Sequence, residues 1–253
     1  MSGPWLNLIL ALAGGFLPAL IWLAFWLRQD AAHPEPKKLI ITCFCLGAAA
    51  VPAALVLQTV FAKLLIGTGD LQAVVSSAPM LALAVIVLWA LVEEGLKLAA
   101  AYAGGLFSKE SDEPIDATVY LVAAALGFAS LENVLYVAGP LLSGDLPGAL
   151  LTGPLRFVGA TTLHAAAAAC LGAFAGFARF RRPGARLGMW VLGFLSAVAL
   201  HVTFNAAIIR ASDASPVAYA AAWVAALLAI VALEQVKAMR VEAVRRRTET
   251  TRD

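Results

Sequence analysis

The stretch Leu91-Val-Glu-Glu-Gly-Leu-Lys-Leu98 decides the fold. It places two adjacent carboxylates and an ammonium, those of Glu93, Glu94 and Lys97, inside an apolar run that covers residues 79–105. An apolar run of this length is typical of a helix that spans a membrane. Each charge costs roughly 2.5–3.5 kcal/mol near the centre of such a helix, so charges retained there indicate a functional site.

The three charges share one helical face. At about 100° per residue, Lys97 projects ~40° from Glu93 and ~60° from Glu94. The lysine can therefore pair with one carboxylate, slightly favouring Glu93, and the other carboxylate is left over. Two adjacent carboxylates in a low dielectric should not both ionise, and one ionised acid beside one protonated acid is a usable base and donor pair.

The composition excludes a soluble protein. Of the 253 residues, 62% are hydrophobic and 13% are charged, and the mean hydropathy is +0.86. A soluble domain has about 45–50% apolar and about 25% charged residues. At about 20 residues per span, we predict an all-α, polytopic transmembrane bundle of about seven helices, which forms a single membrane-embedded domain over residues 1–253.

Hydropathy and turn signals predict the spans. Polar loops are expected at 67–77, around Asp70, and at 143–153, and Asp116 is expected to cap a helix N-terminus. The catalytic core is predicted over 79–210, and a basic tail over 237–253. The predicted helices cover 4–27, 39–65, 79–105, 117–142, 154–178, 187–210 and 216–236.

The distribution of basic residues predicts the orientation. One side of a seven-helix chain holds 14 of the 18 Lys and Arg residues, and the other side holds Lys63, Arg156 and Arg210. The positive-inside rule then places the N-terminus outside and the C-terminus in the cytoplasm. The cluster Arg245–Arg247 is expected to rest on the anionic lipid leaflet.

Four predicted helices carry polar residues within the hydrocarbon region. Counted from the cytoplasmic ends, Glu132, His164 and His201 lie roughly 20–23 Å deep, and the acidic pair lies roughly 15–18 Å deep. We therefore predict one buried polar site in the outer half of the bilayer. Its members are Glu93, Glu94, Lys97, Phe128, Glu132, Asn133, His164, His201 and Asn205.

These groups suit the activation of water. Carboxylates, imidazoles and an amide can take a proton from water and stabilise an oxyanion, and neither a serine nor a cysteine lies in position to be a nucleophile. A zinc site held by Glu132, His164 and His201, with Glu93 or Glu94 as the base, is the alternative, and the cofactor is either none or Zn²⁺. Simple helix-packing contacts are the competing explanation for each residue. For Arg156, the choice is between anchoring at the interface and binding a substrate carboxylate.

An ordered set of motifs carries a resemblance. From about residue 90 to 210 the chain resembles the PrsW family of intramembrane endopeptidases, which is similar to the superfamily of CAAX-prenyl endopeptidases and bacteriocin-processing proteins. The motifs are Glu93-Glu94-Gly-Leu-Lys97, Pro114-Ile-Asp116, Gly127-Phe128-Ala-Ser-Leu-Glu132-Asn133-Val-Leu-Tyr136, His164 and His201-Val-Thr-Phe-Asn205.

The resemblance implies a protease of the bacterial plasma membrane that cleaves a membrane-anchored protein, such as an anti-sigma factor, on its extracytoplasmic side. It implies that Glu93 or Glu94 is the base, and that Glu132 orients water or shares a proton. His201 and Asn205 would stabilise the oxyanion. Glu132 stands where CAAX-type members have a histidine, which leaves metal dependence open.

Two other functions remain as alternatives. The chain could be a non-catalytic scaffold with the same fold, in which case glutamine substitutions would leave its phenotype intact. It could instead be a proton-coupled transporter, which would be expected to show inverted repeats and paired broken helices, and neither is found. The expected partners are the lipid bilayer and a membrane-anchored substrate, with no nucleic acid.

Overall fold

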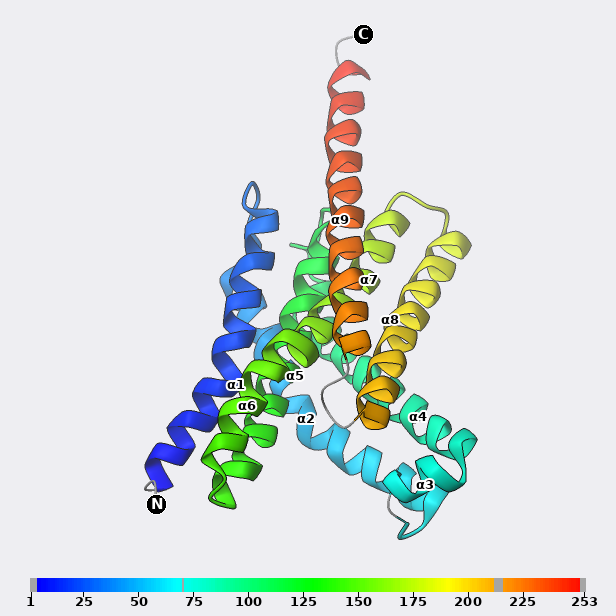
Figure 1. Ribbon diagram of the computed structural model, residues 1–253. Coiled ribbons are helices and arrows are strands. Elements are labelled where there is room, and N and C mark those ends of the chain that lie inside the picture. The colour runs from blue at the N-terminus through cyan, green and yellow to red at the C-terminus, as the bar shows by residue number, and fades with distance from the viewer. Residues whose placement is uncertain (1–3, 70, 212–215, 251–253) are drawn as a thin grey trace.

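The computed structural model describes residues 4–69, 71–211 and 216–250, and within these ranges it is built from helices and contains no strand (Figure 1). Seven of the described helical segments are long and apolar enough to cross a membrane, as predicted. The elements are α1 (Pro4–Leu27), the 3-10 turn Arg28–Asp30, α2 (Lys37–Ile66), α3 (Leu71–Ser77), α4 (Pro79–Ala101), the π-helical turn Tyr102–Leu106, α5 (Asp116–Leu142), α6 (Leu146–Arg156), the π-helical turn Phe157–Thr161, α7 (Thr162–Ala178), α8 (Pro183–Ala211) and α9 (Pro216–Thr250).

Helices α5 and α7 form the centre of the bundle (Figure 1). In the most apolar window of α5, 72% of the residues are buried, and the value is 78% for the span Leu146–Ala178 that contains α7. The other five spans are at most 33% buried, because their outer faces are left for lipid. α5 packs against α1, α2 and α7, and α7 packs against α8 and α9.

Small residues let the central helices approach closely. A Cβ on Gly47 of α2 would overlap the carbonyl oxygen of Ala124, and a Cβ on Gly127 of α5 would overlap that of Phe44. The backbones of α2 and α5 therefore touch, which is the usual use of glycine between membrane helices. The expected close packing around the Gly172-x-x-x-Gly176 pattern is also found, since a Cβ on Gly172 would collide with Thr118 of α5.

Two segments predicted as loops are helical. Residues 146–156 form α6, which begins after Asp145, whose side chain accepts a hydrogen bond from the Gly148 amide at 2.9 Å. This N-cap and a proline in the first turn start a helix despite the neighbouring glycines. Residues 71–77 form α3, and Asp70 lies outside the described residues.

The ends of other helices also differ from the prediction. Asp116 is the first residue of α5, not its N-cap, and its Oδ2 accepts from the Glu113 amide at 2.5 Å. Near it, Tyr120 donates to Glu35, whose pKa is raised above its ordinary value because the carboxyl is partly buried. α8 begins at residue 183 instead of 187, because proline is well suited to a first helical turn.

α9 continues past the predicted span as far as Thr250. The residues 251–253 and the side chains of the Arg245–Arg247 cluster lie outside the described part of the chain, so the expected contact of this cluster with lipid stays a prediction.

The close approach of α2 and α5 predicts a large difference between two substitutions on one helix. Gly127→Ala should lower the free energy of unfolding by about 1–3 kcal/mol, because the added methyl meets backbone that cannot rotate away. Gly139→Ala is the matched control, since a Cβ there meets nothing within 4 Å. Unfolding in detergent micelles measures both variants, and equal stability of the two would contradict the close approach.

Candidate functional site

Helix α4 buries the three charges of the Glu-Glu-Gly-Leu-Lys motif. The residue exposures of Glu93, Glu94 and Lys97 are 6%, 3% and 2%. The Lys97 ammonium lies 2.7 Å from Glu94 Oε1 and 3.8 Å from Glu93 Oε2. The expectation that Glu93 would be the closer partner is wrong. Around the helix axis, Glu94 lies only ~20° further from Lys97 than Glu93 does, and the long, flexible lysine side chain can reach either acid.

Glu94 accepts from two donors at one of its oxygens. Its Oε1 also lies 2.7 Å from His201 Nδ1 of α8. Since an ionised carboxylate only accepts, Nδ1 carries the proton and donates it to Glu94. This contact fixes the His201 ring and leaves its Nε2 facing Glu93, with 3.6 Å between Nε2 and Glu93 Oε2.

Glu93 is engaged through only one of its oxygens. Its Oε1 accepts a hydrogen bond from Gln58 Nε2 of α2 at 2.8 Å. Its Oε2 is buried and accepts no hydrogen bond from any described residue. The two adjacent glutamates therefore differ: Glu94 is held by a cation and an imidazole, whereas Glu93 keeps one oxygen available.

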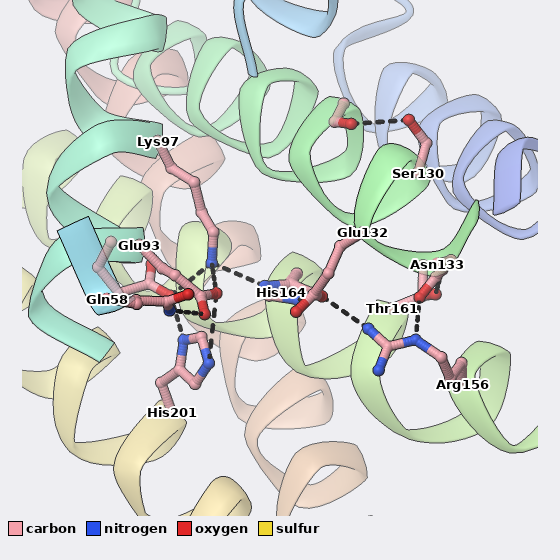
Figure 2. A network of polar contacts seen from close by, with 12 residues as sticks. Gln58, Glu93, Lys97, Ser130, Glu132, Asn133, Arg156, Thr161, His164 and His201 are labelled. Carbon is pink, nitrogen blue, oxygen red and sulfur yellow. Dashed lines mark hydrogen bonds and ion pairs between the residues drawn. The ribbon is translucent and has the colours of Figure 1, made fainter. Parts of the chain in front are cut away.

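A second line of contacts leads from Lys97 toward α5 and α6 (Figure 2). The Lys97 ammonium lies 2.7 Å from His164 Nδ1, and His164 Nε2 lies 3.0 Å from Glu132 Oε2. Because the ammonium can only donate, Nδ1 accepts, and a neutral His164 carries its proton on Nε2 and donates to Glu132. His164 thus connects the lysine of α4 to the carboxylate of α5.

Arg156 completes this line, which was not expected. Its Nη2 donates to Glu132 Oε2 at 2.6 Å, and its Nε donates to Asn133 Oδ1 at 2.5 Å. Asn133 in turn donates to Thr161 Oγ1 at 2.9 Å. Arg156 also lies over the Tyr136 ring, at 3.8 Å from the centroid. The sequence predicted Arg156 near the start of a helix, at the membrane interface. The N-cap of α6 is the signal that could have placed it further inside the span Leu146–Ala178.

Phe128 packs behind the site, against Lys97 and the His164 ring. The Lys97 ammonium lies 4.9 Å from the Phe128 ring centroid, within the range of a cation–π contact. The His164 ring lies 5.8 Å from Phe128 and 5.3 Å from His201. Phe128 is 1% exposed, so it packs against the charges and does not meet solvent.

A cavity of about 790 Å³ opens onto these residues. Of the predicted site residues, those that line it are Glu93, Glu132, His164, His201 and Asn205, whereas Glu94, Lys97, Phe128 and Asn133 lie behind them. The Asn205 amide makes no hydrogen bond to His201 within the described chain, which leaves it able to bind a group in the cavity. The sequence thus predicted the residues that meet, and their chemical roles stay predictions.

The donor atoms that gather most closely are not the predicted metal set. One ligand atom each from Glu93, His164 and His201 lies within 4.8 Å of the others, and all three residues are buried. Glu132, which the prediction included, is instead engaged by Arg156. Two imidazoles and a carboxylate fit a zinc ion. The unpartnered Glu93 Oε2 supports the fit, as does the Glu94 carboxylate that orients His201.

Comparisons with known proteins identify the family of this chain. Residues 35–233 match the model of the PrsW family, described as intramembrane metalloproteases. The chain belongs to the PrsW family. The match begins just before α2 and ends in α9, so it extends beyond the segment that carried the resemblance in the sequence. It follows that the chain is a multi-pass bacterial membrane protein and an intramembrane peptidase.

Curated PrsW relatives are distant but cover most of the chain. A protein named Protease PrsW from Geobacillus kaustophilus is 27% identical over 195 residues, which are 77% of each chain. Its namesake from Bacillus subtilis is 26% identical over 194 residues, which are 77% of this chain and 80% of the relative. That from Clostridioides difficile is 30% identical over 122 residues, which are 48% of each chain. No solved structure matches the chain.

The Arg156–Glu132 pair predicts a measurable coupling. Arg156→Leu should lower the free energy of unfolding by about 2–4 kcal/mol, because it leaves a half-buried carboxylate without its cation. The double variant Arg156→Leu with Glu132→Leu should regain part of this loss, since no charge is then left unpaired.

Unfolding in detergent gives the free energies of the unaltered chain, the two single variants and the double variant, which together form a double-mutant cycle. Arg210→Leu is the control, because Arg210 is exposed at the end of α8 and should change stability by less than about 0.5 kcal/mol. Strictly additive effects of the two substitutions would contradict the pairing.

Proposed function

We propose that this PrsW protein hydrolyses a peptide bond of a membrane-anchored protein within the cavity, with Glu93 as the essential carboxylate. The observation that carries the proposal is the difference between the adjacent acids. Glu94 accepts from Lys97 and His201 and lies behind the cavity, whereas Glu93 lines it with one oxygen that accepts from no described residue. The same observation supports Glu93, rather than Glu94, as the residue that meets water.

The first chemical step is the attack of water on the scissile carbonyl carbon. Glu93 Oε2 takes one proton from the water as its oxygen bonds to carbon, and the carbonyl oxygen becomes an oxyanion. Asn205 lines the same cavity and would donate its amide N–H to that oxygen. His201 would donate from Nε2 only as an imidazolium, with a second proton on that nitrogen. Donors fixed in advance in a water-poor site stabilise such a charge more than mobile water does.

The second step breaks the C–N bond. The proton taken by Glu93 passes to the leaving amide nitrogen, so the acid returns to its ionised form and the carboxyl product is released. Glu132 lies across the cavity, held by Arg156 and His164, and would orient the substrate or the water. Lys97, Phe128 and Asn133 support these groups from behind.

The metal named in the family description has a definite place in this scheme. Glu93, His164 and His201 would hold a zinc ion, which supplies Lewis-acid activation of water. In that case Glu132 is the remaining carboxylate in the cavity that can accept a proton. Glu93 is essential with or without the metal.

The uneven distribution of basic residues supports one side of the membrane as the place where the substrate is cut. The cavity lining extends to Gly67 and Gly69, where α2 ends, at the end of the bundle that carries few basic residues. We place this end outside the cytoplasmic membrane, and the C-terminal end in the cytoplasm. The proposed substrate is a membrane-anchored regulator, such as an anti-sigma factor, cut near the outer half of the bilayer. The catalytic core covers residues 79–210 together with α2.

Substituting the two glutamates separately tests the proposed base. Glu93→Gln should lower the cleavage rate at least about 100-fold, because the amide cannot take a proton from water. Glu94→Gln should retain measurable activity but lower the stability, since it leaves Lys97 and His201 without their shared acceptor.

Substrates are found by comparing the N-termini of protein fragments released from cells that produce the unaltered chain or Glu93→Gln. The fragment identified is then cleaved by purified protein in liposomes. Glu234→Gln is the control, since Glu234 forms an exposed pair with Lys237 away from the cavity. Full activity of Glu93→Gln would overturn the proposed role of Glu93, and no cleavage by the unaltered chain is the result that a scaffold or a transporter requires.

Metal analysis tests the donor set independently of activity. The purified protein should bind about one zinc ion per chain, and Glu93→Ala or His164→Ala should weaken zinc binding at least about tenfold. Asn205→Ala is the matched control, because Asn205 lines the same cavity but is not part of the donor cluster. Elemental analysis and competition with a zinc chelator give the measurement. Zinc-free protein that cleaves at the full rate would exclude the metal.

A further inference from the structure

Gln58 is an unusual residue for its position. It lies in α2, an apolar span with a mean hydropathy of 2.4, and it belongs to none of the motifs that identified the site. Burying an amide in such a helix is costly unless its polar atoms are hydrogen-bonded. The two threonines of α2 satisfy this need locally, because Thr42 donates to Lys38 O and Thr59 donates to Leu55 O.

Gln58 instead reaches across to another helix. Its Nε2 donates to Glu93 Oε1 at 2.8 Å, and the residue lines the cavity beside Glu93 (Figure 2). The backbone of Gln58 is fixed separately, since its carbonyl oxygen accepts from Trp89 Nε1 of α4 at 3.2 Å. The side chain is therefore held at the level of Glu93 by a contact that does not depend on the side chain itself.

The hydrogen bond from Gln58 distinguishes the two oxygens of Glu93. An amide N–H on Oε1 fixes the carboxylate plane and occupies that oxygen. Oε2 is then turned toward His201 Nε2 at 3.6 Å and the Lys97 ammonium at 3.8 Å. Without the amide, the carboxylate could rotate about its last bond and form a closer contact with the ammonium, as Glu94 does.

We propose that Gln58 is a positioning residue, which holds Glu93 so that Oε2 remains the working oxygen in the cavity. This role rests on the proposed function of Glu93. Because Gln58 acts through Glu93, its loss should lower the rate of the chemical step and leave the binding of substrate nearly unchanged. A neutral donor suits this role, since a cation at position 58 would engage Glu93 in an ion pair.

The test is Gln58→Met, which keeps the length and volume of the side chain but removes the donor. We expect kcat to fall about 10- to 100-fold, the range for losing a hydrogen bond to a charged group, with KM within about twofold. Gln58→Asn is a second variant that keeps the amide but is one methylene too short, and it should show the same loss. Thr59→Val is the matched control, because Thr59 lines the same cavity and bonds only within its own helix.

Kinetics are measured in liposomes with the substrate fragment that the Glu93→Gln comparison identifies. Rates are expressed per mole of folded protein, and the unfolding transition of each variant gives the folded fraction. A merely structural role would lower the folded fraction, or change Gln58→Met and Thr59→Val alike, without a selective loss in kcat. If Gln58→Met or Gln58→Asn keeps kcat within twofold while Glu93→Gln is inactive, this inference is wrong and the proposed function stands. If Glu93→Gln is itself active, the proposed function fails first.

Discussion

One shared oxygen holds the site together. Glu94 Oε1 accepts from both the Lys97 ammonium and His201 Nδ1, each at 2.7 Å. On a protein surface such contacts contribute little, but in an apolar span an unpaired charge is too costly to keep. The sharing therefore sets α4 against α8 at this level. The other contacts of Lys97 and of His164 then bring in α7 and α5, so that the placement of the helices follows from the pairing of a few buried charges.

The same pairing makes two adjacent, chemically identical acids unequal. Glu94 is occupied by donors that stabilise its charge, and it orients His201. Glu93 receives one neutral donor and lines the cavity, and its second oxygen is buried and accepts from no described residue. The division of roles is thus set by environment and not by residue type, as in enzymes where two carboxylates of one site act as different groups. Both surroundings are rigid before substrate arrives, so little reorganisation is needed during reaction.

Much of this arrangement could be predicted from the sequence, for a physical reason. Apolar length alone fixes the spans, and charges that cannot face lipid must meet one another, which predicts that Glu132, His164 and His201 converge. The partner of Lys97 could not be predicted, because a flexible four-methylene side chain reaches either acid. Gln58 is polar but uncharged and belongs to no motif, and its partner Glu93 lies on another helix 35 residues away, so the sequence does not indicate their contact. The contact of Arg156 with Glu132 was not predicted, because the glycines and prolines of α6 are typical of loops and placed the start of this span near Arg156, whereas the Asp145 cap starts it earlier.

Hydrolysis in a membrane also needs water at a site whose charges must be kept from lipid. The cavity meets both needs, because its wall follows α2 from Gln58 to Gly67, about 13 Å at the rise of a helix. Lys63 provides a polar position along this wall between the end of the helix and the buried acids. In the proposed mechanism, water would reach Glu93 along this wall from the end of α2 without crossing hydrocarbon. A helical substrate hides its carbonyls in internal hydrogen bonds, so it would have to unwind in this cavity before the proposed attack.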